Sequence, residues 1–165
     1  MKKLIAVLFV LSAMAFGQSK DDSKPLNVYK VDFSVFELQG GKRSNVRNYS
    51  LYLRNDGRTH STKVGNRVPI QTGKEGAFQY LDVGLQFNCA IAGEKDGAPL
   101  LDFNFELGSM VAPETGGVEH VPVIRQIRQD GVAQLPLGKP TIISSTDDTN
   151  TSRTIQVEAT VTLVK

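Results

Sequence analysis

The chain has 165 residues, of which 40% are hydrophobic and 22% charged, and its formal net charge is +2. This length suits one domain, and the composition is that of a folded globular protein rather than a disordered one. The single cysteine excludes a disulfide scaffold, a zinc ribbon and an iron–sulfur site, because each of these needs several cysteines.

The first 17 residues have the layout of a secretory signal peptide. A basic start at Lys2 and Lys3 precedes an apolar run, Leu4 to Leu11, and then small residues. We expect cleavage after Ala15 or after Gly17, and no cysteine lies nearby for a lipid anchor. The run is shorter than the ~20 residues of a membrane-spanning helix. We therefore expect export, from a bacterial cell, to the periplasm, to the outer-membrane surface or to the medium.

Removal of this segment changes the charge. Without Lys2 and Lys3 the 19 basic residues fall to 17, which equals the 17 acidic residues. The exported protein is then close to neutral, so we expect no nucleic-acid partner, which would need a basic surface. Residues 18–26 are expected to form a flexible lead-in and residues 27–165 a single β-domain, and no later apolar run has the length of a transmembrane helix.

The domain is predicted to be all-β, an antiparallel β-sandwich or a partly closed barrel of about 7–8 strands. Apolar and polar residues alternate with a period of two, which is typical of half-buried strands. The alternation runs through Tyr29–Val35, Leu81–Ile91, Leu101–Leu107 and Ile155–Leu163. Its phase is disturbed at Phe36, where a bulge is expected.

Turn signals separate the strands. Asn55-Asp56-Gly57 predicts a hairpin between Tyr49–Leu53 and the next extended segment. Residues 93–97 are expected to join the two most regular strands as a hairpin, which we predict to be the centre of stability. Three aromatic side chains would share its apolar face: Phe87, Phe103 and Phe105.

The few nucleophilic or metal-binding residues do not form a catalytic pattern. His60 and His120 are the only histidines; they are too few for a zinc site, and we expect both to be exposed. Cys89 occupies an apolar position in a strand, so it is predicted to be a small buried hydrophobe rather than a nucleophile. No serine lies in a nucleophile elbow. We therefore expect no enzyme activity, no cofactor and no metal.

Several polar segments have a structural interpretation. Asp147-Asp148-Thr149-Asn150 is interpreted as a hairpin turn, with weak calcium binding as the alternative. Glycosylation sequons start at Asn48 and Asn150, and matter only if the host modifies exported proteins. The basic groups at 42–47 and 125–128 are interpreted as solvated faces rather than binding patches.

Two stretches are more distinctive, namely Val64-Gly65-Asn66-Arg67-Val68-Pro69-Ile70 and then Phe78-Gln79-Tyr80-Leu81-Asp82-Val83-Gly84-Leu85. Followed by the strand Leu100–Ser109 and by Leu137–Ile143, they resemble the β-domain of bacterial secretins, the ring-forming outer-membrane channels of secretion and pilus machines. The resemblance covers residues 64–145. It departs at Ser144-Ser145, where secretins usually carry a glycine pair, and their closing segment is missing.

Three residues of these stretches also have a local meaning. Pro69 suits an edge strand, because proline has no backbone N–H to donate. Gly84, inside an otherwise regular strand, indicates a bend or a close backbone approach. Tyr80 shares the polar face of its strand with Asp82, and we expect hydrogen bonding to a neighbouring strand.

The resemblance implies an exported, non-catalytic β-domain that is a structural or interaction component of the bacterial cell envelope. It would associate with itself or with an envelope protein. The expected partner contact consists of Val64, Gly65, Asn66, Arg67, Pro69, Tyr80 and Asp82. The alternative is a soluble periplasmic binding module that holds a small apolar ligand in the β-fold, lined by Phe33, Phe87, Phe103 and Phe105.

Overall fold

The computed structural model describes residues 26–71, 77–111, 123–148 and 152–164. The predicted signal peptide, both expected cleavage positions, residues 18–25 of the lead-in, His120 and Asn150 lie outside the described residues.

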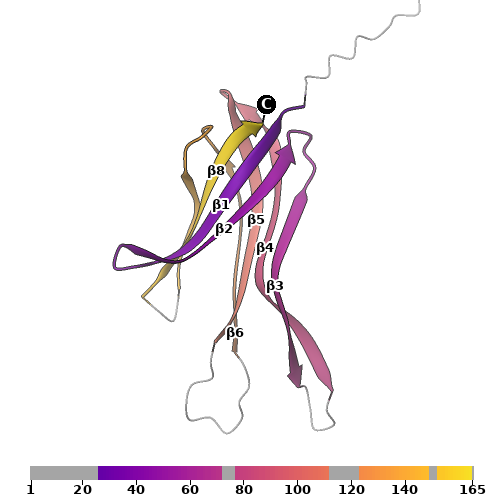
Figure 1. Ribbon diagram of the computed structural model, residues 1–165, viewed down its shortest axis with the longest axis vertical. Helices are drawn as coiled ribbons and strands as arrows, with labels where there is room; N and C mark the ends of the chain where they lie inside the picture. Colours follow the sequence, from indigo (N-terminus) through magenta and orange to yellow (C-terminus); the bar gives the residue numbers. More distant parts are fainter. Residues whose placement is uncertain (1–25, 72–76, 112–122, 149–151, 165) are drawn as a thin grey trace, which may run out of the picture.

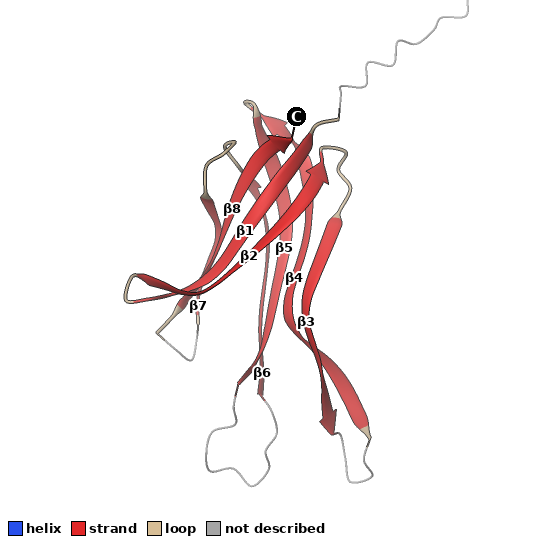
Figure 2. Cartoon of the chain, viewed as in Figure 1, coloured by secondary structure: helices blue, strands red, loops and turns tan. Residues whose placement is uncertain are grey.

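The described residues form two four-stranded sheets that pack face to face as a β-sandwich, and the sandwich does not close on itself (Figures 1 and 2). Sheet A has the strand order β2-β1-β8-β7 and sheet B the order β3-β4-β5-β6. All paired strands are antiparallel. The strands are β1 (Val28–Gln39), β2 (Lys42–Arg54), β3 (His60–Gln71), β4 (Phe78–Lys95), β5 (Ala98–Val111), β6 (Val123–Gln134), β7 (Thr141–Asp147) and β8 (Thr154–Val164).

The core lies between the sheets and consists of the apolar positions that alternate along the strands. In β1 the buried residues up to the bulge are Tyr29, Val31, Phe33 and Val35, and the intervening polar residues face outward. The period-two pattern therefore predicted the buried face of this strand correctly. The same holds for the other core strands, which contribute Leu85, Phe87, Cys89, Ile91, Leu101, Phe103, Phe105, Val157, Ala159 and Val161.

The predicted hairpin of the two most regular strands is confirmed as β4–β5. Phe87 lies opposite Phe105, and the turn at Asp96 and Gly97 has φ angles of 53° and 75°. These positive angles suit the tight two-residue turn of a hairpin. The Phe87 ring stacks at 4.3 Å on Phe33 of sheet A and lies 5.2 Å from the Phe105 ring. This hairpin thus supplies the main aromatic contact between the sheets.

The expected bulge at Phe36 is also confirmed, because the register of β1 against β2 shifts between Val35 and Glu37. Both Val35 and Phe36 are buried as a result. The Arg43 guanidinium covers the Phe36 ring at 4.0 Å and binds Glu158 at 2.9 Å. Part of the basic group at 42–47 is thus packed on an aromatic ring rather than simply solvated.

The hairpin predicted at Asn55-Asp56-Gly57 is wrong, because β2 belongs to sheet A and β3 to sheet B. The Asn55 N–H donates to the Asn27 carbonyl at 3.2 Å, and the Asn27 N–H donates to Asn55 Oδ1 at 2.9 Å. These bonds hold the end of β2 beside the start of β1. The chain then crosses to sheet B, where β3 pairs with β4. A local turn signal specifies a reversal of the chain but not which sheet the next strand joins.

Among the described residues, no helix is both long enough and apolar enough to span a membrane.

Candidate functional site

The structure brings all seven predicted contact residues together on the β3–β4 hairpin. Five of them lie on β3, which is an edge strand of sheet B. The other two lie directly opposite on β4, with Asp82 facing Arg67 and Tyr80 facing Pro69. The position of Pro69 in an edge strand agrees with its missing N–H. Tyr80 is 63% exposed.

Asp82 forms the polar centre of this hairpin. Its carboxylate accepts hydrogen bonds from Lys63 Nζ at 2.6 Å and from Arg67 Nε at 3.1 Å. These bonds hold the pKa of Asp82 below its usual value. Both pairs are exposed to solvent, so they fix the orientation of the side chains more than they stabilise the fold. Asp82 thus bonds to the neighbouring strand β3, whereas the cross-strand bond expected of Tyr80 stays a prediction.

Three glycines form a row across sheet B. Gly65 lies opposite Gly84, and Gly84 lies opposite Gly108. A Cβ atom at Gly84, where φ is +147°, would lie 2.3 Å from the Val64 carbonyl oxygen, and one at Gly65 would lie 2.3 Å from the Val83 carbonyl oxygen. The two backbones are therefore too close for any side chain, as predicted for Gly84.

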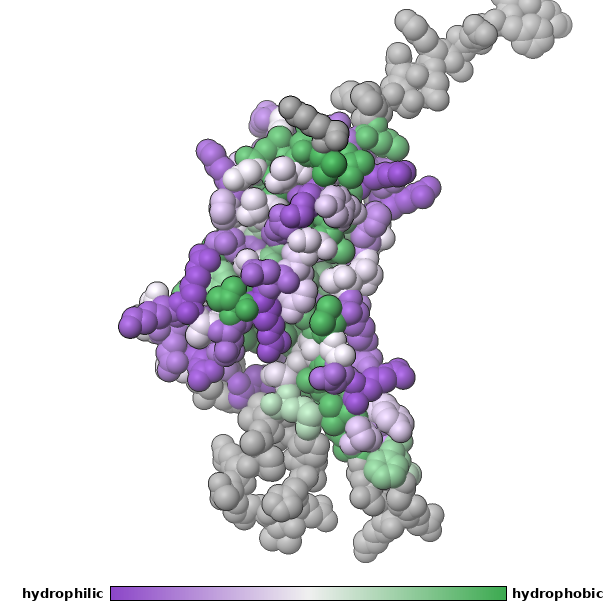
Figure 3. Space-filling view, viewed as in Figure 1, coloured by the Kyte–Doolittle hydropathy of each residue, from purple (hydrophilic) through white to green (hydrophobic). Residues whose placement is uncertain are grey.

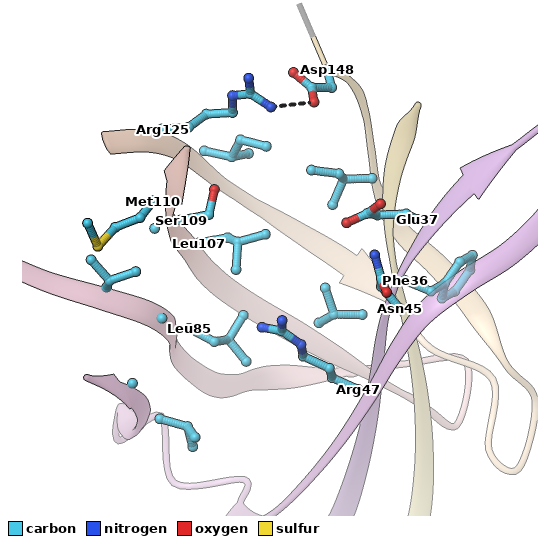
Figure 4. A pocket seen from close by; sticks show the side chains of 18 of the residues that line it. Phe36, Glu37, Asn45, Arg47, Leu85, Leu107, Ser109, Met110, Arg125 and Asp148 are labelled. Atoms are coloured by element: carbon cyan, nitrogen blue, oxygen red, sulfur yellow. Dashed lines mark hydrogen bonds and ion pairs between the residues drawn. The ribbon is translucent and has the colours of Figure 1, made fainter. Parts of the chain in front are cut away.

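Sequence reasoning missed a cleft between the sheets at the end where they diverge. The cleft has a volume of about 650 Å³ and is lined by both sheets (Figure 4). Its residues include the glycine row, Val64 and Asn66, and also Asn45 and Arg47 of β2. The spacing of the glycines was its only signal in the sequence, because the cleft exists only where two sheets face each other.

Of the histidines and the cysteine considered for nucleophilic or metal chemistry, Cys89 and His60 lie among the described residues. Cys89 is 1% exposed, and burial raises the pKa of its thiol to about 12, so the predicted small buried hydrophobe is confirmed. The expectation that His60 is exposed is wrong: it is half-buried, and its Nε2 is buried without a hydrogen-bond partner in the described part of the chain. His60 lies opposite Cys89, and opposite residues of an antiparallel pair share a face.

The polar segment at Asp147 and Asp148 is bound by protein groups. Arg125 Nη1 lies 2.7 Å from Asp148 Oδ2, and Thr154 Oγ1 donates to Asp147 Oδ1 at 2.7 Å. The described residues contain no group of three or more histidine, cysteine, aspartate or glutamate side chains that could hold a metal ion. Arg125, interpreted from sequence as part of a solvated face, is instead an ion-pair partner.

The phenylalanines expected to line a ligand cavity instead fill the core. Phe33, Phe87, Phe103 and Phe105 are each 5% exposed or less and belong to one packed cluster. None of them lines the cleft. On the face shown in Figure 3, hydrophobic side chains are interspersed with hydrophilic ones.

The fold is similar to that of solved bacterial secretin structures. No protein-family model and no curated protein sequence matches the chain. The type II secretion outer membrane complex of Klebsiella pneumoniae, with PulD, PulS and the PulC HR domain, matches with a TM-score of 0.55 and 10% identity, over 85% of this chain and 39% of that one. The secretin GspD of Escherichia coli K12 matches with a TM-score of 0.53 and 9% identity, over 85% and 48% of the two chains.

ExeD of Aeromonas hydrophila matches with a TM-score of 0.53 and 11% identity, over 84% of this chain and 47% of that one. The chain thus spans less than half the length of each of these three structures. The family resemblance drawn from residues 64–145 extends in three dimensions to most of the chain. The protein has the fold of the secretin β-domain.

Proposed function

We propose that this protein is a structural, non-catalytic component of a bacterial envelope assembly, and that copies of it associate through the edges of both sheets. The observation that carries the proposal is that each sheet has two edge strands that pair on one side only within the described residues. Backbone N–H and C=O groups on an open edge are free to pair with another chain. Three of the four edge strands, β2, β3 and β6, have 12 or 13 residues.

The arrangement of the edges favours a head-to-tail contact. The segment 55–59 joins β2 to β3, and both edges lie on one side of the sandwich (Figure 1). On the other side, Gln129 of β6 hydrogen-bonds Thr146 and Ser144 of β7. A neighbour that places its β6 beside β3 therefore also brings its β7 towards β2. Both sheets could then continue from one copy to the next.

Strand direction is compatible with this contact. Each sheet has four antiparallel strands, so its two edge strands run in opposite directions. A copy translated along the sheet therefore meets its neighbour as another antiparallel pair. Contacts of this heterologous kind generate a ring if the rotation closes and a filament if it does not.

The β3–β4 hairpin is the part of this edge that we propose as the partner contact. It carries the seven predicted contact residues, and Val64 and Tyr80 are 53% and 63% exposed. The fold shared with the secretin structures supports an envelope location, and the Klebsiella match is an outer membrane complex. The signal-peptide layout of residues 1–17 supports export to that location.

Light scattering on the protein, extracted gently from cells that express all 165 residues, tests the proposal. A mass of several chains, or a mixed complex with an envelope protein, is the expected result. A monomer at every concentration tested would overturn self-association.

Cysteine cross-linking identifies the edges that meet. Ser61 of β3 lies in one cross-strand row with Asn88, Asn104 and Asp130. Ser61→Cys is combined in turn with Arg128→Cys, Asp130→Cys and Val132→Cys on β6, which allows for an offset between copies. The native Cys89 is buried, so it is not expected to form cross-links. We expect one double variant to give a ladder of oxidised multimers.

The single variants are the matched controls, and none should give a ladder. Disulfide dimers of Ser61→Cys alone would indicate a two-fold contact between β3 edges and would contradict the head-to-tail arrangement.

A further inference from the structure

The cleft between the sheets is lined by apolar side chains from most of the strands. At the level of the glycine row, the packed core gives way to an open space of about 650 Å³. This volume lies within the range of about 300–1,000 Å³ that is typical of small-molecule sites. Its apolar walls are formed by Val35, Tyr49, Leu85, Leu107, Ile127 and Ile155.

Arg47 places a positive charge among these walls. It lies opposite Val35, which is buried in the core, so the strand register directs both side chains between the sheets. Tyr49, Leu51 and Leu53 occupy the following inward positions of β2. Figure 4 shows the Arg47 guanidinium extending into the cleft towards Leu85. In the described part of the chain it makes no ion pair.

The other charged groups of the cleft are paired. Arg125 Nη1 lies 2.7 Å from Asp148, and Arg153 Nη1 lies 2.8 Å from Glu37. Among the described residues that line the cleft, three arginines accompany two carboxylates, and Arg47 is the arginine that pairs with neither of them. A guanidinium is suited to bidentate pairing with a carboxylate, and a partner here would be held next to apolar surface.

The glycine row leaves a further part of the cleft without side chains. Gly65, Gly84 and Gly108 all line it, so a ligand would meet bare backbone there. Such a wall permits close approach by a slender, flexible group. The chemistry of the cleft therefore fits a molecule with an apolar chain and one negatively charged end.

We propose that this cleft binds a long-chain carboxylate, with its apolar chain along Leu85, Leu107 and Ile127 and its carboxylate on Arg47. The site shares Val64, Gly65 and Asn66 with the proposed partner contact, but its ligand would be held within one chain, so its test does not depend on self-association. Failure of either proposal leaves the other standing.

A tryptophan reporter provides the test, because the natural sequence has no tryptophan. Ser109 lines the cleft, so Ser109→Trp places the only indole there. The probe is dodecanoate brominated at its chain end, which quenches a nearby indole. We expect saturable quenching with one molecule bound per chain. Tyr52→Trp, at a position that is 60% exposed and does not line the cleft, should show no saturable quenching.

Charge recognition is tested in the same background. We expect the neutral brominated dodecanol to bind about tenfold more weakly than the acid. Arg47→Gln should weaken binding of the brominated acid by a similar factor and leave binding of the alcohol unchanged. Arg54→Gln is the control, because Arg54 lies on the same strand but outside the cleft. It should change the affinity for neither the acid nor the alcohol. Calorimetry of dodecanoate with the unmodified chain confirms that the indole has not blocked the site.

Several results would overturn the assignment. They are equal affinity for acid and alcohol, equal binding by the Arg47→Gln and Arg54→Gln variants, and absence of calorimetric binding to the unmodified chain. Tighter binding of dodecyl phosphate than of dodecanoate would also reject a carboxylate as the ligand.

Discussion

The Tyr29 hydroxyl donates a 2.6 Å hydrogen bond to the Glu94 carboxylate, and this bond joins sheet A to sheet B at the end of β1 remote from the cleft. The same carboxylate oxygen accepts from Asn27 Nδ2 at 2.9 Å and from Asn55 Nδ2 at 3.1 Å. Glu94 therefore holds the start of β1 and the end of β2 in place. Polar bonds thus connect the sheets at this end, and at the other end the Arg125–Asp148 ion pair lies in the cleft between them.

We expect Tyr29→Phe to lower the free energy of unfolding by about 1.5 kcal/mol near neutral pH, because a partly buried hydrogen bond to a charged group is lost. Burial, followed by the bond to Glu94, raises the pKa of Tyr29 above 10.0. The contribution of the Tyr29 hydroxyl to the stability of the fold is then complete below about pH 10, and it is lost as the pH rises through the folded-state pKa. Urea unfolding at neutral and alkaline pH measures both effects.

The matched control is Tyr52→Phe, because Tyr52 is 60% exposed. It should leave the neutral-pH stability unchanged and keep the alkaline decline of the natural protein. If Tyr29→Phe shows the same alkaline decline as Tyr52→Phe, Tyr29 does not contribute to it.

Gly84→Ala is expected to destabilise the fold by about 3 kcal/mol, through backbone strain and overpacking against β3. The reason is the 2.3 Å approach of the added Cβ to the Val64 carbonyl oxygen. Gly108→Ala tests the neighbouring glycine of the same row, where the nearest atom would lie at 3.5 Å, an ordinary contact. Thermal unfolding should show a clearly lower stability for Gly84→Ala than for Gly108→Ala. Equal losses of stability in the two variants would contradict the close backbone approach at Gly84.

Phe87→Ala should lower the free energy of unfolding by about 4 kcal/mol, because it removes a buried ring and leaves a cavity. The ring contacts Phe33 of sheet A and Phe105 of the same hairpin. Phe78→Ala, at a residue of the same strand that is 60% exposed, is expected to change the stability by less than about 0.5 kcal/mol. Similar losses in both variants would show that the hairpin is not the centre of stability.

The Cys89 thiol is expected to resist iodoacetamide in the folded protein. Burial raises its pKa to about 12 and excludes the reagent, so no reactive thiolate is available near neutral pH. Mass spectrometry should show full labelling in denaturant and slow labelling without it, at a rate set by opening of the core. Rapid labelling of the native protein would place Cys89 at an accessible site.

The arrangement within each hairpin could be predicted from sequence. The alternation in β4 and β5 identified the buried face that carries Phe87, Phe103 and Phe105. The disturbed phase at Phe36 located the bulge. The motif stretches also identified residues that meet on one hairpin, because β3 and β4 are neighbours in both sequence and space. These features depend on local periodicity and short connections, which a sequence displays directly.

Contacts between the sheets were decided only by the tertiary structure. The turn at Asn55-Asp56-Gly57 gave no sign that β3 leaves sheet A, because a turn signal carries no information about the next pairing partner. Arg47 looked like one of several surface charges until β2 paired with β1 and directed it between the layers. Arg47 remains exposed, and its charge environment arises from segments far apart in the chain. The sequence determined the faces of the strands, and the packing of the two sheets decided where those faces enclose a core and where they leave a cleft.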